Sequence, residues 1–123
     1  VGIDIEDESI AMARINAEVN QIDNCRFIAA PAHVALAAED IAATPFDIVI
    51  VDPPRAGLHP KALDGLAAIG APRIAYISCN PATFARDAAL LRREGYRLGR
   101  VTPFDMFPHT MHTELVARFE KNG

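Results

Sequence analysis

The sequence predicts an α/β protein with a mostly parallel β-sheet that ends in an antiparallel hairpin. Short apolar segments rich in β-branched residues alternate with segments whose apolar residues recur at helical spacing, which is typical of a parallel sheet covered by helices. The last two apolar segments, 96–104 and 113–119, are separated by a loop without a helix, so they should pair antiparallel. With 123 residues, half of them hydrophobic, the chain can form one domain with a buried core.

Three strands and two helices are expected in the first half of the chain. The strands are expected over residues 1–5, 25–29 and 46–51. The third, FDIVIV, is the clearest buried strand, because turn residues bound its β-branched run. Asp7 can cap a helix that extends to about residue 20. An alanine-rich helix is expected over 33–42, and it must end before Pro45.

The second half should contain two further helices and three further strands. The helices are expected over 61–69 and 81–94, and the strands over 74–77, 96–104 and 113–119. Residues 52–60 must form a loop, because three prolines exclude regular structure there. Asn80 followed by Pro81 is a favourable helix start, since the Asn side chain can accept a backbone N–H and proline needs no acceptor.

The terminal hairpin makes a Rossmann-like methyltransferase sheet the expected fold, because sheets of that kind end in the same way. Such a domain begins with a further strand and a Gly-rich turn that holds the cofactor, and neither precedes Val1. The chain also opens inside an apparent strand and without an initiating Met. We therefore expect residues 1–123 to be a partial catalytic domain from a longer protein, lacking the first, Gly-rich strand.

Composition argues against a membrane protein and leaves a polyanionic partner open. No apolar run reaches the roughly 18 residues that a membrane helix needs. Residues 1–52 carry ten acidic and two basic residues, whereas residues 53–123 carry six and ten. A polyanion can approach the second half, although ordinary solvated surface explains the same asymmetry. Two cysteines, without metal-ligand spacing or a disulfide framework, fit a reducing, cytoplasmic setting.

Three loops should meet at one edge of the sheet, because each follows a parallel strand. They are DIE at residues 4–6, DPPRAGLHP at 52–60 and SCNP at 78–81. Cys79 then lies where a buried strand ends and a helix begins, and the positive end of the helix dipole favours its thiolate. We interpret Cys79 as a nucleophile. The alternative is a packing role, since free cysteine is among the most buried residue types.

Two acids at this edge are candidates for binding. Asp4 ends a strand, where a carboxylate commonly accepts hydrogen bonds from the ribose hydroxyls of a nucleotide; a solvated or helix-capping carboxylate is the alternative. In DPPR, the prolines fix the backbone and remove amide donors, so the Asp52 carboxylate and the loop carbonyls face the cleft and suit a planar base with N–H groups. Many base-modifying methyltransferases have an aromatic residue where Arg55 stands, which argues against methylation of the adenine amino group.

The segment DMFPHTMHTE, residues 105–114, carries two histidines and an acid between the last two strands. His109, His112 and Glu114 offer metal-ligating groups. Histidines three apart on a proline-containing loop lack the rigid helical spacing of metalloprotease motifs, so we expect no metal. Glu114 opens an otherwise apolar strand, and a carboxylate at such a partly buried edge is a plausible general base. A surface acid on an edge strand is the alternative.

In this order, DPPRAG, SCNPATFARD and DMFPHTMHTE resemble the RNA 5-methyluridine methyltransferase family, which uses S-adenosylmethionine. The resemblance covers nearly the whole chain. It implies that Cys79 adds to carbon 6 of uracil, so that carbon 5 can take the methyl group, and that Glu114 then removes the carbon 5 proton. It also implies that Asp4 holds the cofactor ribose and that Asp52 lies beside the base and the methyl donor.

The resemblance further implies an RNA substrate, either ribosomal or transfer RNA, and contacts to it. These contacts are expected from Asp52, Pro53, Arg55, Asn80 and His109. An iron–sulfur cluster, present in some members of the family, would lie only in a part of the protein that precedes this chain.

Two other functions remain open from the residues alone. An N-methyltransferase acting on a base or a protein needs no cysteine nucleophile, so Cys79 would then be structural and dispensable for activity. A sheet without its first strand would instead be a non-catalytic interaction module. Its exposed, apolar edge would favour self-association.

Overall fold

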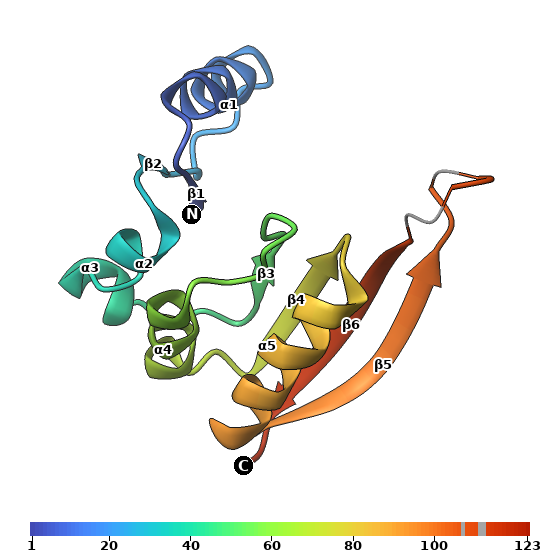
Figure 1. The fold of residues 1–123 in the computed structure, drawn as a ribbon. Coiled ribbons are helices and arrows are strands. Elements are labelled where there is room, and N and C mark those ends of the chain that lie inside the picture. The colour runs from blue at the N-terminus through green and yellow to red at the C-terminus, as the bar shows by residue number, and fades with distance from the viewer. Residues whose placement is uncertain (107, 111–112) are drawn as a thin grey trace.

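Four strands form the main sheet, in the order β3-β4-β6-β5 (Figure 1). They are β3 (Val49–Val51), β4 (Arg73–Ser78), β5 (Tyr96–Phe104) and β6 (Glu114–Lys121). The computed structural model describes residues 1–106, 108–110 and 113–123. β3 and β4 are parallel, whereas β6 is antiparallel to both of its neighbours. The expected α/β fold with a C-terminal antiparallel hairpin is therefore confirmed.

A separate two-stranded parallel sheet contains β1 (Gly2–Asp4) and β2 (Phe27–Ala29). The sequence predicted one sheet; two are present because no described strand pairs with both β1 and β3. Helix α1 (Asp7–Val19) connects β1 to β2. The prediction that Asp7 caps this helix was wrong: Asp7 is already helical, and the N-cap residue is Glu6.

The alanine-rich segment forms two short helices, α2 (Ala32–Ala35) and α3 (Glu39–Ala42), and not the single helix that was expected. Ala38 between them is extended, with φ −67° and ψ 134°. Leu36 and Ile41 are both buried in the core. Because residues five apart on one continuous helix point about 140° away from each other, the break allows both side chains to face the same core.

Helices α4 (Pro60–Ile69) and α5 (Pro81–Arg93) lie beside the main sheet, and α5 covers one face of β4 and β6 (Figure 1). The buried residues of β4 and β6 on this face are Ile74, Tyr76, Ser78, Leu115, Ala117 and Phe119. The ring centroid of Phe84 on α5 lies 5.3 Å from that of Tyr76 and 6.2 Å from that of Phe119. Aromatic pairs attract at these distances, so the three rings join the helix to the sheet.

Helix α5 begins as the sequence predicts. The backbone N–H of Ala82 donates to Asn80 Oδ1 at 3.1 Å, and Pro81 is the first helical residue. Such a cap contributes about 1 kcal/mol to stability. Cys79 directly precedes the cap, so the start of α5 determines where its backbone lies. Throughout the described ranges, every helix is too short or too polar to cross a bilayer.

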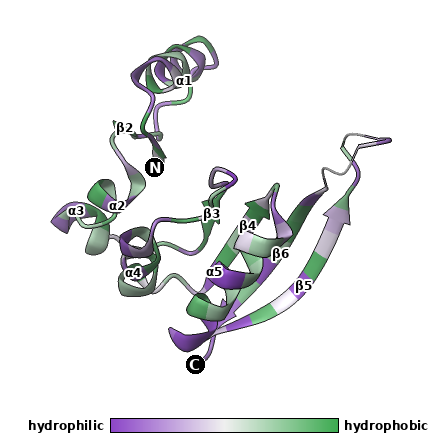
Figure 2. Ribbon diagram, in the orientation of Figure 1, coloured by the Kyte–Doolittle hydropathy of each residue, from purple (hydrophilic) through white to green (hydrophobic). Residues whose placement is uncertain are grey.

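Two strand edges face each other without pairing. Among the described residues, β1 pairs only with β2, and β3 only with β4. The side chains of Ile48 and Ile50 are exposed beside the free edge of β3, Ile50 to 66%. Figure 2 shows β3 as a hydrophobic segment. The surface between the two sheets is therefore apolar.

Candidate active site

Two clefts open where the loops after β1, β3 and β4 converge. The first, termed the Cys79 cleft, has a volume of about 540 Å³. Its lining residues are Asp52, Ile77, Cys79, Phe104, Met106, Glu114 and Val116. The structure therefore gathers into one space three side chains, those of Cys79, Glu114 and Asp52, that stand in separate segments of the sequence.

The strand register explains why Cys79 and Glu114 meet. Ser78 pairs with Leu115 across β4 and β6, so the next position of this antiparallel pair brings Cys79 opposite Glu114. On the other side of β6, Glu114 pairs with Phe104. Directly opposed residues lie on the same face of a sheet. That face is opposite to the one on which Tyr76 packs against α5, so it is not filled by the core.

Cys79 is partly exposed and lies at a helix start. It is a free cysteine of intermediate exposure, and it lies immediately before the N-terminus of α5. A nucleophilic thiol needs access from solvent, and the start of a helix is the positive end of its dipole. Glu114 is also half-buried, whereas Asp52 is exposed.

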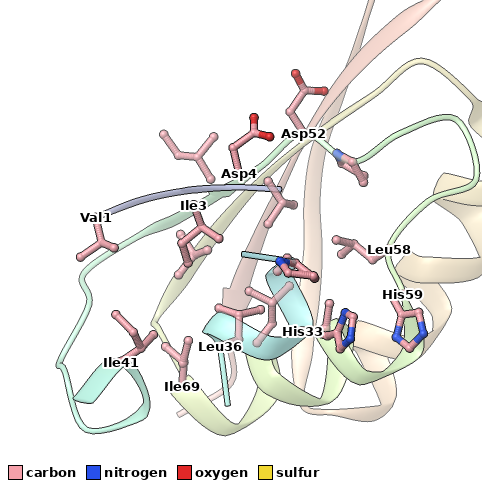
Figure 3. A pocket seen from close by; sticks show the side chains of 18 of the residues that line it. Val1, Ile3, Asp4, His33, Leu36, Ile41, Asp52, Leu58, His59 and Ile69 are labelled. Carbon is pink, nitrogen blue, oxygen red and sulfur yellow. The ribbon is translucent and has the colours of Figure 1, made fainter. Parts of the chain in front are cut away.

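The second cleft, termed the Asp4 cleft, has a volume of about 680 Å³ and lies between β1, β3 and α4. Figure 3 shows Asp4 and Asp52 at one end of this cleft, above apolar side chains that include Ile3, Leu36 and Leu58. Asp52 lines both clefts. Its position at their border connects the Asp4 side of the site with the Cys79 side.

The backbone beside Asp4 orients its carboxylate. The N–H of Glu6 donates to Asp4 Oδ1 at 2.9 Å. The carboxylate is exposed at the end of β1, next to the apolar walls of the Asp4 cleft. A cleft that combines a fixed acceptor with apolar walls can bind a hydroxyl-bearing sugar and an attached ring.

The proline-rich loop that starts at Asp52 is irregular, as expected, and it is fastened to α5. Asn80 Nδ2 donates to the backbone carbonyl of Arg55 at 3.1 Å, and Thr83 Oγ1 donates to the same carbonyl at 3.0 Å. The amide of Asn80 therefore caps α5 with its oxygen and holds the loop with its nitrogen. Pro53 is half-buried at the Asp4 cleft, and Arg55 is exposed. Contacts from these residues to a substrate stay predictions.

His109 lies in the loop between β5 and β6, where it is exposed and has a φ of 67°. His112, the second histidine of the metal-binding alternative, lies outside the described residues, as do Phe107 and Met111. In the part of the chain that the structure describes, no group of three or more His, Cys, Asp and Glu side chains could hold a metal ion. The contact of His109 with a substrate stays a prediction.

Two residues of the Cys79 cleft, Phe104 and Met106, were not predicted from the sequence. They line the cleft while 46% and 63% exposed. The sequence feature that could have indicated them is an apolar pair at the end of a strand, next to a polar loop, where exposed apolar side chains often mark a binding surface.

Asp87, which is fully buried on α5, was not predicted either. It lies three residues after Phe84 and four before Leu91, on the apolar face of the helix. An acidic residue on the apolar face of a helix is unusual, and this feature of the sequence could have indicated Asp87 as a candidate.

Comparison with known proteins identifies the family of this chain. A model of the tRNA (uracil-5-)-methyltransferase family matches residues 1–122. The chain is 42% identical over 120 residues to the 23S rRNA (uracil(1939)-C(5))-methyltransferase RlmD of Vibrio vulnificus, covering 98% of this chain and 27% of that protein. It is 43% identical over 122 residues to an uncharacterised RNA methyltransferase of Caldanaerobacter subterraneus, covering 99% and 26%.

A solved structure has the same fold. The tRNA (uracil-54, C5)-methyltransferase of Pyrococcus abyssi, in complex with S-adenosyl-L-homocysteine, superposes with a TM-score of 0.80 and 44% sequence identity, covering 96% of this chain and 28% of that one. The chain thus spans between 26% and 28% of the length of these relatives. Because the family match extends over nearly the entire sequence, the chain belongs to the tRNA (uracil-5-)-methyltransferase family.

Proposed function

We propose that the protein transfers a methyl group from S-adenosylmethionine to carbon 5 of a uridine in ribosomal or transfer RNA. The observation that carries this proposal is the Cys79 cleft, which has Cys79, Glu114 and Asp52 around one space. Enzymes that modify a base in RNA or DNA take that base out of its stack and into a pocket. The family match and the names of the relatives support the reaction class.

Cys79 is the nucleophile in the proposed mechanism. Carbon 5 of uracil is a weak nucleophile until a thiolate adds to carbon 6 and the electron pair of the 5,6 double bond forms an enolate. Carbon 5 then takes the methyl group from the sulfonium of S-adenosylmethionine, whose carbon–sulfur bond breaks to leave neutral S-adenosylhomocysteine. Glu114 removes the proton from carbon 5, the double bond forms again, and the sulfur of Cys79 leaves. Cys79 directly follows β4, and the register of β4 with β6 brings it opposite Glu114, the first residue of β6; this placement supports the division of roles.

S-adenosylmethionine supplies the methyl group, and the residues of the Asp4 cleft fit its adenosyl part. The Asp4 carboxylate, oriented by the Glu6 N–H, accepts hydrogen bonds from the ribose hydroxyls. Apolar side chains of the same cleft, Ile5 and Leu58 among them, exclude water from around the adenine ring. Asp52, at the border of the two clefts, accepts a hydrogen bond from the N3–H of the uracil and keeps the base beside the methyl donor.

RNA is the proposed partner, and residues 1–123 are the proposed part of a catalytic domain that contacts the modified base. Pro53, Arg55, Asn80 and His109 are the proposed further substrate contacts. The ten basic residues between 53 and 123 support an approach of the RNA from that half of the chain. The names of the relatives include both ribosomal and transfer RNA. Both cysteines are free thiols, which supports a reducing, cytoplasmic setting.

We also propose that the isolated 123-residue chain self-associates through the edge of β3. This edge is unpaired among the described residues, and Ile48 and Ile50 beside it are exposed. The outer edge strand at the other side of the sheet, β5, carries Arg97, Arg100 and Pro103, which protect an edge against pairing. The apolar edge of β3 has no such protection.

Replacement of Cys79 by alanine in the full-length protein is expected to abolish formation of 5-methyluridine, with a rate at least about 10³-fold lower, because the carbon 6 adduct cannot form. Mass spectrometry of nucleosides from digested RNA measures the product. Cys25→Ala is the matched control, since Cys25 is an exposed free thiol outside both clefts. If Cys79→Ala still methylates RNA, Cys79 has a packing role only, and an N-methyltransferase activity is favoured.

Glu114→Gln is expected to trap the methylated intermediate, because the amide cannot remove the carbon 5 proton and the sulfur of Cys79 cannot leave. The rate of 5-methyluridine release should fall by about 10²–10⁴-fold, while RNA covalently bound to protein accumulates on denaturing gels. Glu120→Gln, on the same strand, should behave like the wild type. Normal turnover by Glu114→Gln would remove Glu114 from the mechanism.

Sedimentation velocity of the 123-residue chain should show a sedimentation coefficient that rises with concentration, because chains pair along β3. Ile50→Lys should reduce this rise, since a charged side chain blocks edge pairing. Val19→Lys is the control, because Val19 is exposed on α1, away from this edge. A wild-type chain that stays monomeric at all concentrations would contradict the proposed self-association.

A further inference from the structure

The proposed mechanism makes no use of the one acidic side chain in the described residues that is fully buried, that of Asp87. Its Oδ2 accepts hydrogen bonds from the Leu58 N–H at 2.7 Å and from the Tyr76 hydroxyl at 2.6 Å. Its Oδ1 accepts from Arg86 Nε at 2.8 Å and Nη2 at 2.7 Å. This carboxylate therefore joins a loop amide, a strand side chain and a helix side chain in the same small volume.

Arg86 extends the same contact to the carbonyls of the loop. Its Nη2 also donates to the backbone oxygen of Ala56 at 3.0 Å and to that of Leu58 at 3.3 Å. Gly57, between them, has a φ of +81°. A Cβ atom at Gly57 would lie 2.5 Å from Arg86 Nη2 and 2.7 Å from Asp87 Oδ2. The loop approaches this ion pair so closely that only glycine fits.

The side chains that hold the loop form one face of α5. Asn80, Thr83 and Asp87 are spaced three and four residues apart, which places them on one side of the helix start. Asn80 and Thr83 bind the carbonyl of Arg55, and the Arg86–Asp87 pair binds the backbone of residues 56 and 58. We term this set, Asn80, Thr83, Arg86 and Asp87, the loop clamp. It fixes a segment that has no regular hydrogen bonding of its own.

Tyr76 supports the clamp from the sheet. Burial of its phenol, together with the hydrogen bond to the Asp87 carboxylate, raises the pKa of Tyr76 far above its ordinary value. Its hydroxyl therefore remains a donor to Asp87 at neutral pH. Tyr76 belongs to β4, three residues before Cys79. The Asp87 carboxylate is therefore hydrogen-bonded to the strand that directly precedes the thiol.

We propose that Asp87 is a positioning residue, which sets the place of the loop carrying Asp52 relative to Cys79. The loop begins at Asp52, α5 begins just after Cys79, and the clamp ties the two together. The Asp87 carboxylate is fully buried, while the side chain of Arg86 stays half-exposed. Burying a carboxylate is costly unless it is paired and hydrogen-bonded, and here its hydrogen bonds lead to the loop, to β4 and to α5, which favours a role in specifying geometry. The proposal rests on the proposed function, since it concerns alignment of a uracil between the loop and the thiol.

The test uses the full-length protein and RNA that contains 5-fluorouridine, with S-adenosylmethionine present. Fluorine at carbon 5 cannot leave as a proton, so an enzyme that adds a cysteine to carbon 6 stalls as a covalent adduct. The final amount of adduct counts the competent sites, and its rate of formation reports alignment at each site. Methylation of ordinary RNA gives kcat and the KM values separately.

Asp87→Asn should leave the count of competent sites and both KM values near those of the wild type, while the rate of adduct formation and kcat fall by about 10²-fold, the effect expected of a misplacement near 1 Å. Tyr76→Phe, which removes a single donor from the same carboxylate, should cause a smaller fall in the same two rates. Glu94→Gln, an exposed carboxylate at the end of α5, is the matched control and should change neither.

A merely structural role would lower the count of competent sites and leave the rate at each remaining site unchanged, and this result would overturn the proposal. Unchanged rates in both variants would overturn it as well. If Asp87→Asn does not fold, Tyr76→Phe decides by the same two readouts. A wild type that forms no adduct would overturn the proposed function itself, which distinguishes that failure from a failure of the positioning role.

Discussion

The hydrogen-bond register between β4 and β6 is the constraint on which the site depends. Ser78 opposite Leu115 brings Cys79 opposite Glu114, and the pairing of β6 with β5 adds Phe104 on the other side. Because side chains alternate between the two faces of a sheet, a slip of one residue would move Glu114 to the face that packs against α5. The aromatic contacts among Tyr76, Phe84 and Phe119 resist such a slip.

The loop after Asp52 needs a different kind of support, because prolines deprive it of regular hydrogen bonds. Its backbone is instead bound by side chains of α5, with the buried Asp87 at the centre. One helix start therefore serves three purposes. It is capped by Asn80, it follows the thiol of Cys79, and it holds the loop that borders both clefts.

Local chemistry made much of the fold predictable. The Asn80–Pro81 helix start, the proline-rich loop and the terminal hairpin each depend on residues that are near each other in the sequence. The single helix over 33–42 was wrong, because the need to bury both Leu36 and Ile41 outweighed alanine's helical preference. Asp87 and the cleft residues Phe104 and Met106 were missed, since their partners lie on other elements. The convergence of Cys79, Glu114 and Asp52 agrees with the family resemblance, while their chemical roles stay proposals.

Peptide mapping of the adduct between the full-length protein and 5-fluorouridine RNA is the most direct test of a cysteine-addition mechanism. Mass spectrometry after protease and nuclease digestion identifies the residue that carries the modified nucleotide. If Cys79 is the nucleophile, a single attachment is expected at Cys79, with the methyl group already on the base. Attachment at another residue, or methylation of RNA without any adduct, would contradict this mechanism.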